Sequence, residues 1–313
     1  MKFKLDFQVN NNGIELSHHD SVVSLGSCFA DEIGAKLMSS GFTINSNAFG
    51  TLFHPLAIMN TLNYAFSSNK EVNILQRNDL FFAWEASSKL FGTSHKEIEN
   101  KILSSRSQLK QNIKDASLLI LTFGTAWAYE HKELSRVVGN CHKEPLTSFK
   151  KELSNIDLML NECEATINKI RVLNPAIKII VTVSPVRHKK DGLIQNNRSK
   201  ARLLELTHRL VEESDCIYFP AYEIIMDELR DYRFFKKDLV HPSNEAVNYV
   251  WEKFEEASIK DSTLEIISAY QKINRVLAHR SLFPNSKEDH LRIQKAEESK
   301  RLFITEYPEV NWG

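Results

Sequence analysis

Short apolar runs alternate with longer amphipathic segments over the first 260 residues of the chain. Residues 21–25 form a β-branched run, and residues 29–38 place apolar side chains at helical spacing. The same alternation predicts strands at residues 42–44, 117–122, 178–183 and 216–219, and helices at residues 55–66, 147–173, 197–214 and 244–257. A charged helix ends near Lys114, and residues 72–92 predict an inserted hairpin or an irregular excursion.

Strands that alternate with helices of this length predict parallel pairing, because a parallel connection needs a crossover. We therefore expect an α/β fold: a doubly wound, flavodoxin-like sheet of five parallel strands in three α/β/α layers. Residues 1–260 form this domain. Residues 261–313 are charged and helical, and we expect a C-terminal helical extension packed on the same domain. A lid or an oligomer contact is the alternative role for it, and the oligomeric state stays open.

Charge and composition narrow the classes of protein. Lys plus Arg and Asp plus Glu both total 40 of 313 residues, so no net basic charge points to a nucleic-acid partner. Residues 1–7 hold no run of signal-peptide length, and no stretch of about 18 apolar residues occurs. We therefore expect a cytoplasmic protein that does not bind a membrane. Four scattered cysteines without a Cys-x-x-Cys pair favour neither a disulfide scaffold nor structural zinc.

Gly26, Ser27 and Cys28 lie between the first predicted strand and the helix that follows it. The N-terminus of a helix presents unpaired N–H groups and positive potential, which favours a thiolate and supplies donors to an oxyanion. Cys28 is therefore a candidate nucleophile. The alternative is that Cys28 is a small buried core residue.

Asp238 and His241 lie three residues apart near the end of the predicted domain. This spacing lets the carboxylate orient an imidazole that faces a nucleophile. Alone this four-residue pattern is weak. Here it follows the last of five predicted strands in an α/β chain that begins with Gly26-Ser27-Cys28, and it therefore predicts a catalytic pair.

Six segments resemble the signature segments of the GSCFA family, which is grouped with the SGNH (GDSL-like) hydrolases. They are GSCFA at 26–30, NAFGT at 47–51, LTFGTAW at 121–127, NCHK at 140–143, TVSPVRH at 182–188 and LRDYRFF at 229–235. The match runs in order from about residue 3 to residue 255. The resemblance implies an SGNH-type fold with its site at the carboxyl ends of the strands.

The resemblance also implies roles for individual residues. Cys28 stands where the superfamily has its serine nucleophile, and a one-residue shift of the turn would present Ser27 instead, so both are candidates. The N–H groups of Cys28 and Gly50 correspond to oxyanion donors. Ala126 replaces the asparagine that supplies a third donor, a loss that typically costs about 3 kcal/mol of transition-state stabilisation. Thr125, Asn140 and His142 are candidate substitutes.

Basic residues near these motifs are candidates for holding the substrate. His142, Arg187, Arg230 and Arg233 are the candidate substrate-binding residues, since guanidinium binds carboxylate or phosphate in a bidentate manner. A solvated surface loop is the alternative for the arginines at 230 and 233. Cys141 and His142 lack further ligands at metal-binding spacing, so we expect no metal and no cofactor.

These residues predict an acyl ester or thioester hydrolase, or an acyltransferase, acting on a small acylated molecule. Cys28 or Ser27 attacks, His241 transfers the proton and Asp238 orients the ring. A degenerate SGNH-fold binding or regulatory protein is one alternative, motivated by Ala126. An O-acetylesterase acting on a small glycoside or sugar derivative is another.

Overall fold

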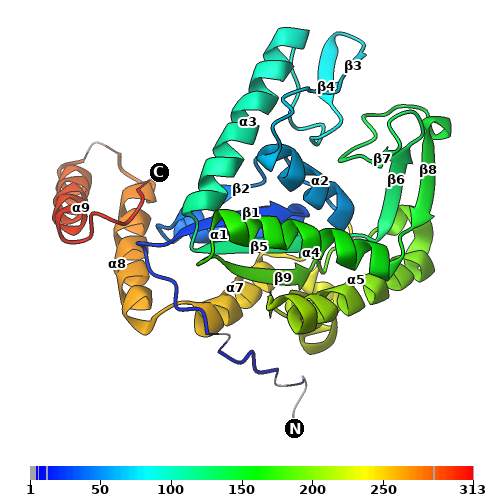
Figure 1. Ribbon diagram of the computed structural model, residues 1–313. Helices are drawn as coiled ribbons and strands as arrows, with labels where there is room; N and C mark the ends of the chain where they lie inside the picture. The colour runs from blue at the N-terminus through cyan, green and yellow to red at the C-terminus, as the bar shows by residue number, and fades with distance from the viewer. Residues whose placement is uncertain (1–4, 6, 12, 285, 313) are drawn as a thin grey trace.

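Five parallel strands form the central sheet, in the spatial order β10-β9-β5-β1-β2 (Figure 1). The computed structural model describes residues 5, 7–11, 13–284 and 286–312, so most of the residues 1–7 used above lie outside it. The strands are β1 (Ser21–Gly26), β2 (Thr43–Ser46), β5 (Leu118–Phe123), β9 (Lys178–Val183) and β10 (Ile217–Tyr218). Counted along the chain this order is 2-1-3-4-5, and the expected flavodoxin-like sheet is confirmed.

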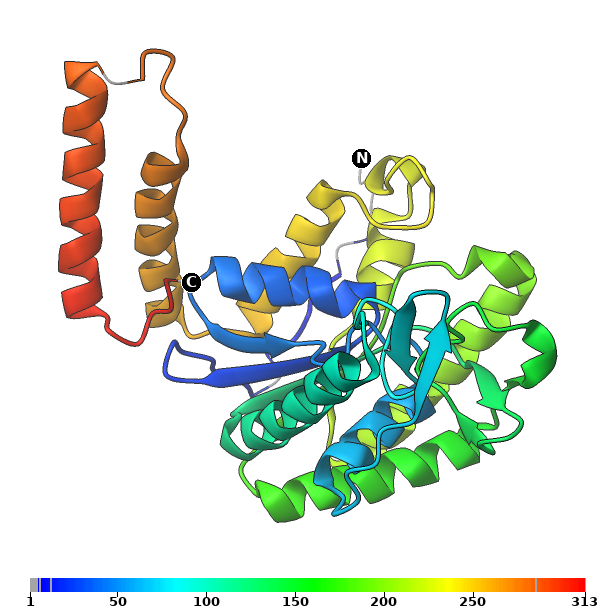
Figure 2. The same cartoon turned by 90° about the horizontal axis from the view of Figure 1, so that it is seen from above.

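Helices cover both faces of this sheet, which confirms the three layers. The sheet helices are α1 (Cys28–Ser39), α2 (Pro55–Phe66), α3 (His95–Asp115), α4 (Ile156–Leu173), α5 (Gly192–Ser214), the short α6 (Ala221–Glu223) and α7 (Asn244–Ser258). Val23 and Leu25 of β1 pack into the core under α2 to α5, whereas Val22 packs into the core under α1 and α7. Figure 2 shows α1 and α7 on one side of the strands and α3 and α4 on the other.

Two small antiparallel sheets lie outside the central one. The expected hairpin is present as β3 (Ile74–Arg77) and β4 (Leu80–Ala83). The second sheet, β6 (Trp127–His131), β7 (Arg136–Val137) and β8 (Phe149–Leu153), corrects the predicted helix at residues 147–173. Residues 149–153 pair with β6, and α4 begins only at Ile156, where the Asn155 side chain accepts the Asp157 N–H at 2.7 Å. Likewise α5 begins at Gly192, five residues before its predicted start.

The C-terminal segment consists of α8 (Asp261–Ala278) and α9 (Lys287–Glu306), which lie side by side at one end of the molecule (Figures 1 and 2). Ile267 of α8 belongs to the core under α1 and α7. Beyond α9, the Asn311 N–H donates to the Gly41 carbonyl at 2.8 Å, so the end of the chain returns to the loop after α1. Helix α8 and the end of the chain thus each contact the rest of the molecule.

Gly26 brings β1 closest to β5. Its φ is +143°, and a Cβ placed there would lie 2.1 Å from the Thr122 carbonyl oxygen. The Gly26 N–H donates to Asn47 Oδ1 at 2.8 Å, and the next residue, Ser27, donates its N–H to Thr122 at 3.0 Å. No side chain fits at this position without displacing β5.

Substituting Gly26→Ala is expected to destabilise the fold by more than about 3 kcal/mol, because steric overlap with backbone adds to the strain of a positive φ. The measurement is urea unfolding followed by far-ultraviolet circular dichroism. Gly192→Ala is the matched control, since its φ is +81° but nothing lies within 4 Å of the added Cβ. Equal losses for the two variants would contradict the steric argument.

Candidate active site

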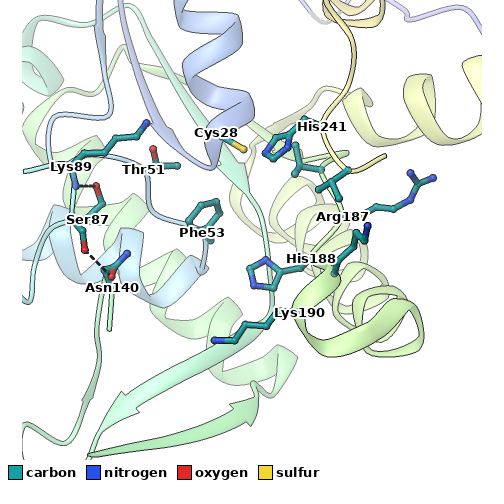
Figure 3. A pocket seen from close by; sticks show the side chains of 14 residues that line it. Cys28, Thr51, Phe53, Ser87, Lys89, Asn140, Arg187, His188, Lys190 and His241 are labelled. Carbon is teal, nitrogen blue, oxygen red and sulfur yellow. Dashed lines mark hydrogen bonds between the residues drawn. The ribbon is translucent and has the colours of Figure 1, made fainter. Parts of the chain in front are cut away.

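Cys28 opens onto a cavity of about 460 Å³ at the carboxyl ends of β1 and β9. The cavity lies at the point where the strand order reverses, the usual place for sites in open α/β sheets. His241 lines the same cavity, and Figure 3 shows the Cys28 sulfur pointing toward the His241 ring. The two motifs from opposite ends of the domain therefore meet.

Ser27 and Cys28 have different surroundings. Ser27 is only 1% exposed, and its Oγ accepts the Phe29 N–H at 3.3 Å, which makes it the N-cap of α1. Cys28, the first residue of the helix, is partly exposed and lines the cavity. The serine hydroxyl thus stabilises the helix end while the thiol faces the cavity.

The surroundings of the Cys28 thiol oppose its ionisation. Burial raises the pKa of Cys28, and the negative charge of Asp31, one turn along α1, raises it further. The amide of Cys28 itself and the ammonium of Lys200 act in the opposite direction but do not outweigh them. The shift of the Cys28 pKa is therefore opposite to the one expected from the helix N-terminus, because desolvation exceeds the helix-end contribution.

Asp238 and His241 form a closed turn. The His241 Nδ1 lies 2.7 Å from Asp238 Oδ2, while Asp238 Oδ1 accepts the N–H groups of Val240 at 2.9 Å and His241 at 3.0 Å. These hydrogen bonds, the one from the His241 ring first, hold the pKa of Asp238 well below its usual range. A neutral ring that donates from Nδ1 keeps its Nε2 lone pair for a proton from the cavity.

The expected oxyanion donors are only partly brought together. Asn140 lines the cavity, and its Oδ1 accepts from Ser88 Oγ at 3.1 Å and from the His142 N–H at 2.8 Å, which leaves the Nδ2 group as a donor. Gly50 does not fit its assigned role, because its N–H donates to the Asn47 carbonyl at 2.6 Å within a tight turn. Thr51, the next residue, lines the cavity in its place.

Thr125 faces away from the cavity. It is 5% exposed, its N–H donates to the Phe53 carbonyl at 3.1 Å and its hydroxyl lies 3.1 Å from Ser199 Oγ. The neighbouring Ala126, in place of an asparagine, is fully buried and donates its N–H to Ser199 at 2.7 Å. Neither residue is placed to contact an acyl group in the cavity.

His142 has a supporting position instead of the expected substrate contact. Its ring nitrogens lie 3.0 Å from Ser88 Oγ and 3.0 Å from the Ala83 carbonyl, and burial lowers its pKa to about 4. The neutral ring stacks on Phe82 with 5.1 Å between centroids. His142 therefore fixes the loop that carries Asn140.

The three candidate arginines are separated. Arg187 lines the cavity, with its guanidinium 4.2 Å from the Phe235 ring centroid and a hydrogen bond of 3.2 Å to the Leu239 carbonyl. Arg230 lines a neighbouring cavity that Arg187 also borders. Arg233 forms an ion pair of 3.1 Å with Asp231 and lines neither cavity. Only Arg187 is thus placed beside Cys28.

Sequence reasoning missed several residues that line the cavity. They are Thr51, Phe53, Ser87, Ser88, Lys89, Lys189 and Lys190. The basic run 187–190 directly after strand β9 was a usable signal, because that strand ends at the sheet edge where the cavity lies. Lys89 gave no such signal, since it follows the inserted hairpin and reaches the site only through the fold.

Within the described residues, no group of three or more His, Cys, Asp or Glu side chains is arranged to hold a metal ion. Among the described helices, none combines the length and the apolar character needed to cross a bilayer.

Fold and site together define an α/β protein whose cysteine and Asp-x-x-His motif share one cavity at the sheet edge. The chain belongs to the GSCFA family, whose model matches residues 21–254. This match confirms the family resemblance of the sequence motifs. No curated protein matches the sequence.

Solved structures show more distant likenesses. The psychrotrophic esterase EstA from Pseudoalteromonas sp. is 8% identical, covers 76% of this chain and 96% of its own, and has a TM-score of 0.39. A carbohydrate esterase family 3 protein from Talaromyces cellulolyticus is 7% identical, covers 80% and 98% respectively, and has a TM-score of 0.35. Similarity at this level carries no information about substrate.

The raised pKa of Cys28 predicts how the thiol alkylates. Its reaction with iodoacetamide is expected to reach half its maximal rate at a higher pH than that of the same cysteine in the urea-unfolded chain, because only the thiolate reacts. Peptide-resolved mass spectrometry separates Cys28 from Cys141, whose pKa burial raises to about 11.

The Asp31→Asn variant removes one cause of the raised Cys28 pKa. The pH at which Cys28 alkylation reaches half its maximal rate is therefore expected to fall. Glu298→Gln, on exposed α9, is the matched control and is expected to leave it unchanged. A midpoint at or below that of the unfolded chain would refute the raised pKa.

Proposed function

We propose that this protein cleaves a small acyl ester or thioester by transferring the acyl group to the Cys28 thiol and then to water or another acceptor. The observation that supports this most directly is the shared cavity of Cys28 and His241, with Asp238 hydrogen-bonded to the far side of the His241 ring. Nucleophile, base and orienting carboxylate then occur in the order that acyl transfer requires.

The proposed reaction begins from a neutral thiol. His241 Nε2 takes the Cys28 proton as the sulfur bonds to the acyl carbon, and Asp238 stabilises the imidazolium that forms. The tetrahedral oxyanion collapses, the bond to the leaving oxygen or sulfur breaks, and His241 returns the proton to that atom. A water molecule, deprotonated by His241, then attacks the acyl-Cys28 thioester and releases the acid and the free thiol.

Oxyanion stabilisation in this scheme comes from the N–H of Cys28 at the start of α1 and from the Asn140 side chain. Asn140 takes the place of the donor missing at Ala126, since its Nδ2 group lies on the same cavity as the thiol. A thioester is the better acyl donor to a thiol, because the covalent intermediate is itself a thioester and little energy is lost in forming it. The proposal therefore favours thioesters over oxygen esters.

A binding protein without catalysis is the second candidate, and Ala126 is the observation that favours it. The missing amide typically costs about 3 kcal/mol, or a factor of roughly 100 in rate, when nothing replaces it. A protein of this kind would bind an acylated ligand in the cavity and release it unchanged.

Hydrolysis of a short-chain thioester tests the proposal. Cys28→Ala and His241→Ala are each expected to lower kcat/KM by at least about 10³-fold, because the catalytic groups act as a unit. Ser27→Ala is the matched control at the adjacent position: it is expected to retain activity within a few-fold while losing about 1 kcal/mol of stability with its cap.

Three results would go against the proposed mechanism. Activity that survives His241→Ala excludes the base. Activity that survives Cys28→Ala but not Ser27→Ala moves the nucleophile to the serine. No turnover by the wild type, together with ligand binding, supports the second candidate.

A further inference from the structure

The cavity around Cys28 is strongly basic although the chain as a whole carries no net charge. Its lining includes Lys89, Arg187, His188, Lys189 and Lys190, besides His241, and no Asp or Glu side chain among the described residues. In Figure 3 Lys89 lies on one side of the cavity, and Arg187, His188 and Lys190 lie on the other sides. A concave site lined by one sign of charge concentrates its field on a bound ligand.

Neighbouring carboxylates neutralise only part of this charge. Lys89 forms an ion pair with Asp31 at 3.2 Å. Lys189 and Arg187 donate to the backbone carbonyls of Asp238 and Leu239, which carry no full charge. The carboxylate of Asp191, beside Lys190, is already paired with Lys151. The Asp238 carboxylate adjoins the same rim and is hydrogen-bonded to the His241 ring at 2.7 Å. Arg187, Lys189 and Lys190 outnumber this one carboxylate, so the rim opposite Asp31 keeps an excess of positive charge.

We propose that the substrate carries a phosphate or carboxylate beside its acyl group, bound by Lys189, Lys190 and Arg187 while the acyl carbon lies at Cys28. This inference rests on the proposed function, since it names the class of substrate for the same site. The exposed Lys189 and Lys190 attract a negative charge, and the half-buried Arg187, which packs against Phe235, gives the anion a defined position.

Reactivity of Cys28 tests the charge of the cavity without any turnover. Iodoacetate and iodoacetamide differ in charge but are similar in size. Relative to the urea-unfolded chain, folded Cys28 is expected to favour iodoacetate by about tenfold at low salt, and less at high salt. Lys190→Glu is expected to abolish the preference, whereas Lys295→Glu on α9 is the matched control. An unchanged ratio between folded and unfolded chains would overturn the proposal.

Matched substrates test recognition itself. Acetyl-coenzyme A and S-acetyl-N-acetylcysteamine share the thioester, but only the former carries phosphates, and S-acetyl-3-mercaptopropionate supplies a carboxylate instead. For at least one of the two anionic substrates, kcat/KM is expected to be at least about tenfold higher than for the neutral substrate. The difference is expected to come mainly from a lower KM. The Lys190→Glu variant is expected to show no such difference. Equal turnover of all three refutes the substrate class and leaves the proposed function intact. If none of the three substrates acylates Cys28, the proposed function is refuted. The ratio of the iodoacetate and iodoacetamide rates then still shows whether the cavity attracts anions.

A different observation concerns Lys200, which the proposed mechanism has not used. Lys200 is 2% exposed, and its Nζ donates to the carbonyls of Gly124 at 2.8 Å and Ser184 at 2.6 Å. These carbonyls follow directly after β5 and β9, at the sheet edge that carries the site. Burial lowers the pKa of Lys200 to about 7, and the nearby Cys28 is the group that opposes this effect.

Lys200 is anchored to a residue that packs against the turn before Cys28. A Cβ on Gly124 would lie 3.2 Å from Ser27 Cβ, so the carbonyl that holds Lys200 belongs to a residue in contact with the turn before Cys28. Lys200 can donate to the two carbonyls in either protonation state, and its protonated form adds a third hydrogen and a full positive charge. A buried cation interacts strongly with a charge that forms nearby, because little water screens it.

We infer that Lys200 is a positioning residue whose positive charge stabilises the thiolate and oxyanion that form at Cys28, and so offsets part of the donor lost at Ala126. The alternative is that Lys200 only pairs the two strand-end carbonyls. A neutral side chain with N–H donors separates these roles, since it keeps the pairing without the charge.

Lys200→Gln and Lys200→Met are therefore compared with the wild type. Both are expected to raise the pKa of Cys28, measured by the pH dependence of iodoacetamide alkylation, and to lower kcat by about tenfold or more with little change in KM. The other titratable groups around the thiol, Asp31, Glu32 and His241, are the same in both variants. Normal alkylation and kcat in Lys200→Gln would show a purely structural role, even where Lys200→Met does not fold.

Discussion

The close approach of β1 and β5 at Gly26 is the constraint on which the site depends. Both polar groups of Gly26 are engaged, its N–H by Asn47 Oδ1 at 2.8 Å and its carbonyl by the Leu52 N–H at 2.9 Å. Asn47 also donates to Asp31 at 2.5 Å, so one side chain ties the strand end to the first turn of α1. These hydrogen bonds fix the conformation of the turn. The fixed turn determines the directions of the next two side chains, so that the serine caps the helix and the cysteine faces the cavity.

Residues close in sequence made the fold and the central pair of the site predictable. The strand, turn and helix at residues 21–38 and the Asp238–His241 turn each carry their own local signal, and a parallel sheet brings their ends to one edge. Residues 149–153 were assigned to a helix because their strand character depends on pairing with β6, which no local pattern shows. Gly50 was misassigned for a similar reason: its N–H is used by a turn whose geometry exists only in three dimensions. Lys200 carried no signal at all, since a lysine on an amphipathic helix is ordinarily solvated.

Opposing electrostatic effects act on the thiol. Desolvation and Asp31 favour the neutral form, whereas the helix N-terminus and Lys200 favour the thiolate. In the proposed mechanism a base must therefore remove the proton, and His241, hydrogen-bonded to Asp238, has that role. In the proposed mechanism, the basic rim, the buried lysine and the helix end would place positive charge where negative charge develops during acyl transfer. They would thereby offset the amide that Ala126 lacks.

Burial of the nucleophile also bears on its chemical durability. Peroxides oxidise the thiolate and react slowly with the protonated thiol, so a cysteine held neutral at rest resists conversion to sulfenic acid. Cys28 opens onto a cavity and has no neighbouring cysteine described as a disulfide partner, since all four thiols are free. Under the proposed mechanism, the raised pKa would preserve an accessible sulfur between turnovers, and the thiol would react only when an acyl group lies beside it and His241.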